Sequence, residues 1–519
     1  MKKLTKVLAL ALAFTLLLAG CGGSATQSTS ANEGQTAETQ ESELKDTVIF
    51  AQGADVTSLD PHIGKETPAV TVHGQIFDTL LATDKDMNII PGLAESWEIL
   101  SDTSYKFNIR KGVKFHDGSE LTAEDVKFSL DRAMASSYVS YIVNFIDNVE
   151  VVDNYTVIVN TKEPYAPTLM NLTHPSAAIV PKAIVEKDPE ALKTHPIGTG
   201  PYKFVEWKPG EYAKLEANPD YFRGAPKTKY VIMKVIPEAA QRTIALETGE
   251  VDIAYDLSAN DLSKVAENSD LKLLEGTSLS AWFLQFNTKH KPFDNKLVRQ
   301  AIRYAIDSQT IVDTLLYGAG EVAGSIIPPV AFGYQEVDTI KYNKEKAKEL
   351  LAQAGYPNGF DATLYVNDNQ QRIEICQVIQ SQLKEVGINV EVKVLEFATF
   401  IDSTNKGEHD MGYYGWVTST ADADYTYYPI YHSSQHGAPG NRSFIANADI
   451  DKYIEEGRVT TDPAARLQSY KALEQILTEE SPVAPLYYSE VNVGTSKKVQ
   501  GFEVQPAGYH SYLNVTVSK

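Results

Sequence analysis

The stretch "RIEICQVIQSQLKEVGINVEVKV" (372–394) indicates how this chain folds. Its first part predicts a helix from residue 373 onward. In its second part four apolar residues, from Ile388 to Val394, alternate with polar ones, which predicts a strand with one apolar face. A helix that leads directly into a strand is typical of a crossover unit on a sheet. The sequence therefore predicts a mixed α/β protein.

Further strands and helices are expected along the chain. Strands are predicted at 47–52 and 105–110, and a hairpin is predicted over 149–161 with its turn at Asp153 and Asn154. Capping residues predict where four helices start: Thr122, which stands three residues before Asp125, then Asp294, Asn343 and Asp462.

The N-terminus has the pattern of an export signal. Lysines at positions 2, 3 and 6 precede an apolar run too short for a lasting membrane span, and the run ends in "LAGC" (18–21). This order resembles the bacterial lipobox, in which the cysteine receives a lipid and becomes the new N-terminus. We expect residues 1–20 to be a signal peptide, Cys21 to be the lipidation site and residues 21–43 to be a flexible tether. The alternative is an ordinary secretory signal with a chance cysteine.

Charge and cysteine content exclude several classes of protein. The chain has 47 basic and 68 acidic residues, and loss of the signal peptide would remove three of the lysines. Nucleic acids require basic patches, so no nucleic-acid partner is expected. Cys376 is the one cysteine besides Cys21, so we expect neither an intramolecular disulfide nor a cysteine-based zinc site. A chain of this length is expected to divide into more than one core.

Motifs of common enzymes are missing from the sequence. It has no Gly-x-Ser-x-Gly elbow, no His-Glu-x-x-His and no phosphate loop. Asp422 and Asp424 could be imagined as a glycosidase pair, but on an extended chain they would share one side of a sugar instead of flanking it. We therefore expect no enzyme and no cofactor.

Three histidines could suggest a metal site. His432 and His436 are four residues apart in "YHSSQHG", and His409 lies upstream. Serine, glutamine and glycine around the pair favour a loop over a helix that would align the two rings. We expect hydrogen-bonding histidines and no metal site here.

Four ordered blocks carry a resemblance to a known family. They are 89–133, which begins "IIPGLAESWEIL", 197–222, which begins "IGTGPY", 286–307 and 342–360. Together they resemble the oligopeptide/dipeptide-binding family of extracellular solute-binding proteins, the receptors of ABC importers. The likeness covers nearly all of 45–519, and relatives of this kind carry peptides, glutathione, nickel chelates or haem.

The resemblance implies two lobes around a cleft. The first lobe would consist of 44–82, 195–278 and 486–519, and it would carry 83–194 as an inserted subdomain. Residues 279–485 would form the second lobe. The chain would cross between the lobes near residues 279 and 485, where a hinge would let them close over a solute.

The stretch "HDMGYYGWVTSTADADYTYY" (409–428) matches the family segment that lines this cleft. Trp416 would form a wall of the pocket with Tyr414, and the extended backbone at Gly415 and Val417 would hydrogen-bond a peptide by strand addition. The glycine would let the ligand backbone approach closely. The alternative is that Trp416 and the tyrosines are core residues.

The charged ends of a peptide would need partners in the cleft. Peptide-binding relatives often carry an aspartate three residues after this tryptophan, where this chain has Ser419. The resemblance therefore shifts the ammonium partner to Asp422 or Asp424, with Asp422 preferred. A carboxylate would suit the planar fork of an arginine, and the resemblance places Arg372 there; the alternative is that Arg372 is a solvated residue at a helix start. Trp282, just past the first crossing, is either a further cleft ring or a packing residue.

The resemblance predicts a monomeric receptor anchored by Cys21 outside the cytoplasmic membrane or in the periplasm. It would deliver short peptides or glutathione-like compounds to an ABC permease. Two alternatives stay open. A receptor for nickel or another metal chelate would need His432 or His436 in the cleft, and a cell-surface hydrolase would need catalytic groups that face each other across it.

Overall fold

A computed structural model describes residues 43–64, 66–337, 340–438 and 440–519. The expected signal peptide, the lipidation site at Cys21 and nearly all of the expected tether lie outside the described residues. Residues 43–519 form one compact unit. No helix within the described ranges is long and apolar enough to cross a bilayer.

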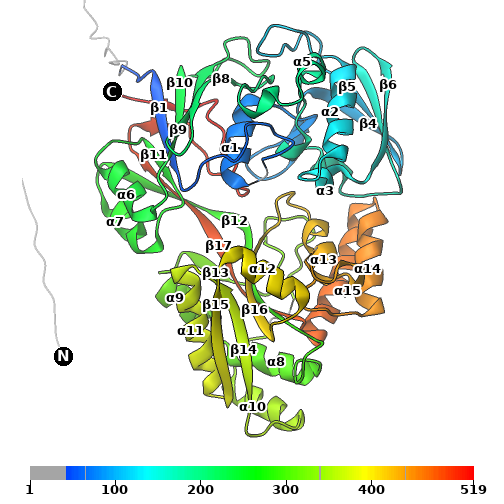
Figure 1. The fold of residues 1–519 in the computed structure, drawn as a ribbon, viewed down its shortest axis with the longest axis vertical. Coiled ribbons are helices and arrows are strands. Elements are labelled where there is room, and N and C mark those ends of the chain that lie inside the picture. Colours follow the sequence, from blue (N-terminus) through cyan, green and yellow to red (C-terminus); the bar gives the residue numbers. More distant parts are fainter. Residues whose placement is uncertain (1–42, 65, 338–339, 439) are drawn as a thin grey trace, which may run out of the picture. The chain divides into compact units, whose positions relative to one another are not determined.

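A mixed sheet of eleven strands runs through the described part of the chain (Figure 1). Its order is β15-β14-β16-β12-β17-β11-β1-β10-β9-β8, and β13 pairs with β17 beside this path. The strands are β1 (Thr47–Gln52), β8 (Tyr202–Lys208), β9 (Tyr212–Ala217), β10 (Tyr230–Val235), β11 (Ile253–Tyr255), β12 (Leu271–Phe286), β13 (Gly320–Val322), β14 (Phe360–Asn367), β15 (Ile388–Leu395), β16 (Met411–Val417) and β17 (Val483–Ser496).

β12 and β17 connect the two halves of this sheet. They pair antiparallel from Leu271 opposite Ser496 to Gln285 opposite Val483, with register shifts between Thr277 and Phe283. β17 continues to β11 on one side, and β12 continues to β16 on the other. The predicted crossings near 279 and 485 fall within these two strands, and the lobe boundaries drawn from them remain predictions.

Separate hydrophobic cores pack on the two halves of the sheet. One core joins β1, β10 and β11 through residues such as Phe50, Met233 and Ile253. Another joins β14, β15 and α11 through residues such as Leu364 and Ile379. This arrangement follows from the length of the chain, because a single core rarely grows beyond a few hundred residues.

A second, four-stranded antiparallel sheet lies within the predicted inserted subdomain. Its order is β4 (Ala94–Ser101), β5 (Ser104–Ile109), β7 (Thr156–Thr161) and β6 (Ile146–Asp153). The predicted hairpin is confirmed, with its turn after Asp153. Helix α2 (Ala123–Ala135) covers this sheet and starts with the predicted capping box of Thr122 and Asp125.

The predicted helix starts are confirmed to within a few residues. Asn343 caps α10 (Lys344–Gln353), and Asp462 caps α15 (Pro463–Glu480). Asn295, one residue after the predicted Asp294, caps α8 (Lys296–Ala305). The helix expected from residue 373 starts three residues earlier, because Asn369 caps α11 (Gln370–Lys384).

The remaining elements complete the layers around the sheets. The helices are α1 (Thr67–Ile76), α3 (Ser140–Val143), α4 (Thr168–Asn171), α5 (Lys182–Lys187), α6 (Ala239–Glu247), α7 (Leu262–Glu267), α9 (Ser308–Leu315), α12 (Phe397–Lys406), α13 (Asp424–Tyr431) and α14 (Ala448–Val459). The short strand pairs are β2 (Leu81–Thr83) with β3 (Ile89–Pro91) and β18 (Val499–Gln500) with β19 (Thr516–Val517).

Candidate functional site

The end of β16 offers a strand edge with free backbone groups. β12 pairs with β16 along its full length, but β14 pairs with it only at Met411 and Gly412. On that second edge, no strand of the described residues pairs with positions 413–417. Gly415 and Val417 are both exposed. The Val417 carbonyl accepts a hydrogen bond of 2.9 Å from the N–H of Ser419, and the remaining unpaired N–H and C=O groups on such an edge can accept an added strand.

The carboxyl ends of two parallel strands bring an arginine to this edge. β14 and β16 run parallel, so Asn367 and Gly415 both lie near the carboxyl ends of these strands, on the same side of the sheet's end. The loop after β14 leads into α11, and Arg372 stands in its first turn. The Arg372 Nη1 donates a hydrogen bond of 2.7 Å to Asn367 Oδ1. In the part of the chain that the structure describes, no carboxylate forms an ion pair with Arg372.

The ring of Trp282, a residue of β12, lies next to the Arg372 guanidinium. The guanidinium carbon of Arg372 is 4.7 Å from the centroid of the Trp282 ring. The same ring stacks on Tyr413 at 5.3 Å and on Tyr487 at 6.2 Å. Cation–π contacts of this kind fix the direction of a guanidinium without neutralising its charge. Trp282 is half-buried, so it serves both as packing and as a platform for Arg372.

The structure gives its own reason for a glycine at position 415, next to the Trp282 ring. A Cβ at this position would lie 2.8 Å from the Trp282 ring, closer than a Cβ can approach another heavy atom. The glycine therefore makes room for Trp282 across the strand pair. The expectation that it also lets a ligand backbone approach stays a prediction, because the space of its side chain is occupied by the protein's own indole.

Trp416 lies where three parts of the chain meet. Its ring is 5.9 Å from Tyr425 of α13, and Tyr425 is 6.2 Å from Tyr141 of α3. Trp416 is half-buried, and its indole Nε1 is buried with no hydrogen-bond partner among the described residues. A buried donor without an acceptor is costly and rare in folded proteins.

Tyr414 occupies a packed position instead of a cleft wall. It is 7% exposed, and its ring lies 5.2 Å from Phe400 and 6.2 Å from Phe283. The guanidinium of Arg442 lies 5.4 Å from the Tyr414 centroid. Packing therefore accounts for this residue, and its predicted role next to Trp416 gains no support.

Both carboxylate oxygens of Asp422 have hydrogen-bond partners within the protein. Two nitrogens of Arg466 donate hydrogen bonds of 2.6 Å each to its two oxygens, and both residues are buried. The backbone N–H of Asp424 donates a third bond, of 2.9 Å, to Asp422 Oδ1. This arrangement corrects the preference for Asp422 as the partner of a ligand ammonium, because its charge is already balanced by a bidentate arginine.

Asp424 is partly used. Its Oδ2 accepts a hydrogen bond of 3.0 Å from the hydroxyl of Tyr165, and its Oδ1 lies 3.6 Å from Arg458 Nε without a hydrogen bond. Burial raises the pKa of the Asp424 carboxyl, and the charge of Arg458 opposes that rise. The guanidinium of Arg458 also lies 3.6 Å from the centroid of the Tyr428 ring. The buried Asp424 and the half-buried Arg458 thus form an ion pair beside Tyr165.

Two of the three histidines named above, His432 and His436, have hydrogen-bond partners elsewhere. His432 contacts Ser434 at 2.7 Å and Glu455 at 3.2 Å, and His436 contacts the carbonyl of Ile445 at 2.9 Å. His409 is buried, and burial lowers its pKa to about 3, so the ring is neutral. The described residues contain no group of three or more histidine, cysteine and carboxylate side chains that could hold a metal ion.

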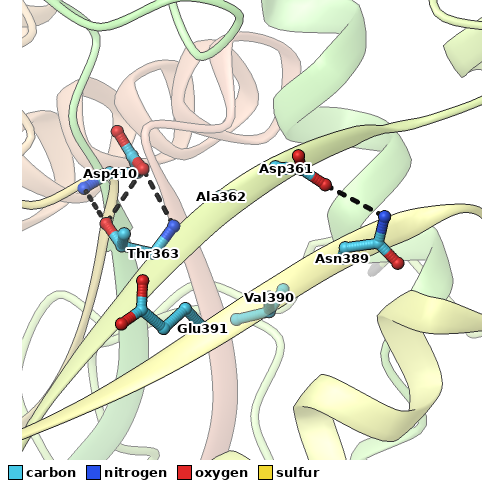
Figure 2. Close-up of a pocket in the computed structure, with 7 residues that line it drawn as sticks. All are labelled: Asp361, Ala362, Thr363, Asn389, Val390, Glu391 and Asp410. Atoms are coloured by element: carbon cyan, nitrogen blue, oxygen red, sulfur yellow. Dashed lines mark hydrogen bonds between the residues drawn. The ribbon is translucent and has the colours of Figure 1, made fainter.

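A separate hollow lies on strands β14 and β15 (Figure 2). Two of its three acidic side chains, Asp361 and Asp410, are already engaged. Asp410 accepts hydrogen bonds of 2.8 and 2.9 Å from the backbone and hydroxyl of Thr363, and Asp361 accepts one of 3.0 Å from Asn389. His290 contacts Asp410 at 2.9 Å. These hydrogen bonds join β14 to β15 and to the segment before β16, so they have a structural role.

Several residues of the site could not be found by local sequence reasoning. Tyr141, Tyr165, Arg458 and Arg466 come from segments far from the cleft stretch in sequence. Arg466 carries one weak signal, since it stands in the first turn of a predicted helix where an acidic residue is the favoured choice. The others have no local signal.

The fold defines a class of protein: a mixed α/β protein of two lobes, in which no strand of the described residues covers the second edge of β16 at positions 413–417. The family described as "Bacterial extracellular solute-binding proteins, family 5 Middle" matches this chain over residues 88–438. The chain therefore belongs to family 5 of the bacterial extracellular solute-binding proteins, the receptors of ABC importers.

Named relatives are similar over most of the chain. The glutathione-binding protein GsiB of Escherichia coli O1:K1 / APEC is 31% identical over 472 residues, which are 88% of this chain and 92% of that protein. The structure of DppA from Helicobacter pylori in complex with the peptide STSA has a TM-score of 0.79 and 30% identity, over 91% of this chain and 98% of that one. NikZ from Campylobacter jejuni in complex with Ni(L-His) has a TM-score of 0.77 and 26% identity, over 91% and 97%. These relatives are solute-binding receptors and not enzymes.

Proposed function

We propose that this receptor captures short peptides or glutathione-like compounds and delivers them to an ABC permease. The observation that carries the proposal is the open edge of β16 at positions 413–417, which lies between Trp416 and the Trp282–Arg372 pair. An extended solute would hydrogen-bond this edge through its own backbone, so affinity would depend little on its side chains. GsiB and DppA, which bind such solutes, support this class of ligand.

The aromatic residues would supply the apolar part of the site. The Trp416 indole would cover the solute and donate its unpartnered Nε1–H to a solute carbonyl. Gly415 and Val417 would contribute backbone groups, and Arg372 would take a carboxylate of the solute. Asp424 would have to give up its contact with Arg458 to receive an amino group, because Tyr165 already binds its other oxygen. The lipid on Cys21 would keep the monomeric receptor at the outer face of the membrane.

A binding experiment tests the proposal directly. Because residues 43–519 form their own compact unit, the chain without residues 1–21 is suitable for calorimetry and thermal-shift measurements. Di- to hexapeptides or glutathione should bind and raise the melting temperature, and sugars should not. Stabilisation by sugars alone would contradict the proposal. A Ni(L-His) complex, with and without a chelator, tests the metal-chelate alternative that NikZ suggests.

Trp416→Ala tests the anchor. We expect a loss of binding free energy of about 1 kcal/mol or more, as for a buried aromatic residue in an interface. Trp97→Ala is the matched control, because Trp97 is also half-buried but packs on the core of the four-stranded sheet. Equal affinity in both variants would assign Trp416 to packing alone.

A further inference from the structure

The cleft stretch offers no free carboxylate at the three positions where one could meet an ammonium. Ser419 has a neutral hydroxyl. Asp422 is bound by both arms of Arg466 at 2.6 Å. Asp424 has Tyr165 on one oxygen and Arg458 3.6 Å from the other. Each aspartate is thus matched by one arginine, and the net charge of these two pairs is zero.

An added ammonium next to Asp424 would be close to a like charge. It would have to approach the Oδ1 atom that already faces Arg458. Like charges within a few ångströms oppose each other strongly where water is excluded. Asp424 is 4% exposed, so solvent offers little screening there. The pair is therefore a poor receptor for a protonated amine.

The other end of the site has the opposite character. Arg372 lies over Trp282 and donates to a neutral amide, and no described carboxylate pairs with it. Its charge is held in place but not balanced. An arginine of this kind at the carboxyl edge of parallel strands is suited to an anionic group. With two neutral pairs and one unbalanced arginine, the described charges here favour an anion.

We propose that this receptor selects its solute by a carboxylate and does not require a free amino group, so it accepts amino-blocked and acidic peptides. The inference rests on the proposed function, since it assumes that a peptide lies along β16. Arg372 determines the specificity, and the ion pairs at Asp422 and Asp424 remove the requirement for an ammonium. The solute class is therefore peptides and amides with a free carboxylate, whether or not the α-amine is acylated.

The experiment compares three forms of one peptide by calorimetry: trialanine, N-acetyl-trialanine and trialanine amide, with glutathione as a further probe. We expect acetylation to change the dissociation constant by less than about threefold, and amidation to weaken binding by about tenfold or more. Arg372→Gln should weaken the two free acids by a similar factor and leave the amide nearly unchanged.

Arg442→Gln is a closely matched control. Arg442 also lies over a ring, that of Tyr414, and also donates to a neutral amide, that of Asn405 at 2.9 Å. It lies next to His409 at the opposite end of β16. Its replacement should leave the preference for free acids intact.

Each outcome separates the two proposals. The inference would be overturned if acetylation weakened binding about tenfold or more and Asp424→Asn weakened the binding of trialanine by a similar factor. The peptide-binding function would still stand. Equal binding of acid and amide would overturn the role of Arg372 in the same way. Absence of binding by all three peptides and by glutathione would contradict the proposed function itself.

Discussion

At the scale of single residues, the site depends on side chains that are used twice. Trp282 packs on Tyr413 and supports Arg372, and Gly415 makes room for it. Asp422 holds Arg466 and also accepts the first N–H of α13. Because each residue has internal partners, a substitution changes stability and binding together, and a matched control is needed to separate them.

Two glycines with opposite surroundings give the first prediction. Gly415→Ala would press a methyl group against the Trp282 ring at 2.8 Å, and we expect a loss of about 1–3 kcal/mol in stability together with weaker binding. Gly74, an exposed residue inside α1, has no atom within 4 Å of its would-be Cβ. Gly74→Ala should stabilise the protein by about 0.5–1 kcal/mol. Urea unfolding of both variants checks the contrast, which an unchanged Gly415→Ala variant would disprove.

The buried pair gives the second prediction. Asp422→Asn leaves Arg466 as a buried charge without its counterion, so we expect a loss of about 3–5 kcal/mol in unfolding free energy. Asp131→Asn is the control, because Asp131 pairs with Lys127 on an exposed helix face. Such surface pairs contribute little, and the melting temperature should hardly change. Similar losses in both variants would mean that Asp422 is not the structural anchor described above.

At the scale of elements, capping residues predicted where helices begin more accurately than apolar periodicity did. Asn343, Asp462 and the capping box of Thr122 act as predicted, since a cap is decided by residues within one turn. The start of α11 was placed three residues late. Asn367 and Asn369 both lie near this start, and only the end of β14 decides which of them caps the helix.

The cap of α11 gives the third prediction. Asn369 Oδ1 accepts the backbone N–H of Arg372 at 3.1 Å, so Asn369→Ala should cost about 1 kcal/mol in stability and also loosen Arg372. Asn343→Ala removes the equivalent bond at α10, from Lys346 at 3.0 Å. It should cost about as much stability without a change in peptide affinity. Calorimetry and thermal melting together distinguish the two, and equal affinities would argue against a role of α11 in binding.

At the scale of the whole molecule, contacts between distant segments close the site. The Tyr165 hydroxyl reaches Asp424, and the N–H of Ala166 donates to the carbonyl of Arg458 at 2.7 Å. These bonds join the segment after β7 to α13 and α14. If the predicted lobes open along β12 and β17, we expect these bonds to break, so they would favour the closed form over the open one.

Tyr165→Phe gives the fourth prediction. The variant loses a hydrogen bond to a buried carboxylate, a loss of about 1–3 kcal/mol, and we expect faster solute dissociation because closure is less favourable. Tyr155→Phe is the control, since Tyr155 donates to Glu120 at 2.7 Å on the exposed face of the four-stranded sheet. Stopped-flow measurement of the dissociation rate checks this prediction. Equal rates in the wild type and Tyr165→Phe would show that the contact plays no part in closure.

The sequence by itself determined the class of fold, the positions of most caps and strands, and the family. All of these depend on residues within one local window or on the order of such windows along the chain. It also directed attention to residues 409–428, where β16 and Trp416 lie.

Only the tertiary structure decided the chemistry of the site. Arg466 is 44 residues from Asp422, and Tyr165 is 259 residues from Asp424, so no local pattern could pair them. Strand order and register set which side chains meet, as when β12 places Trp282 opposite Gly415. The charge of a carboxylate depends on such distant partners, because burial makes the nearest opposite charge decisive.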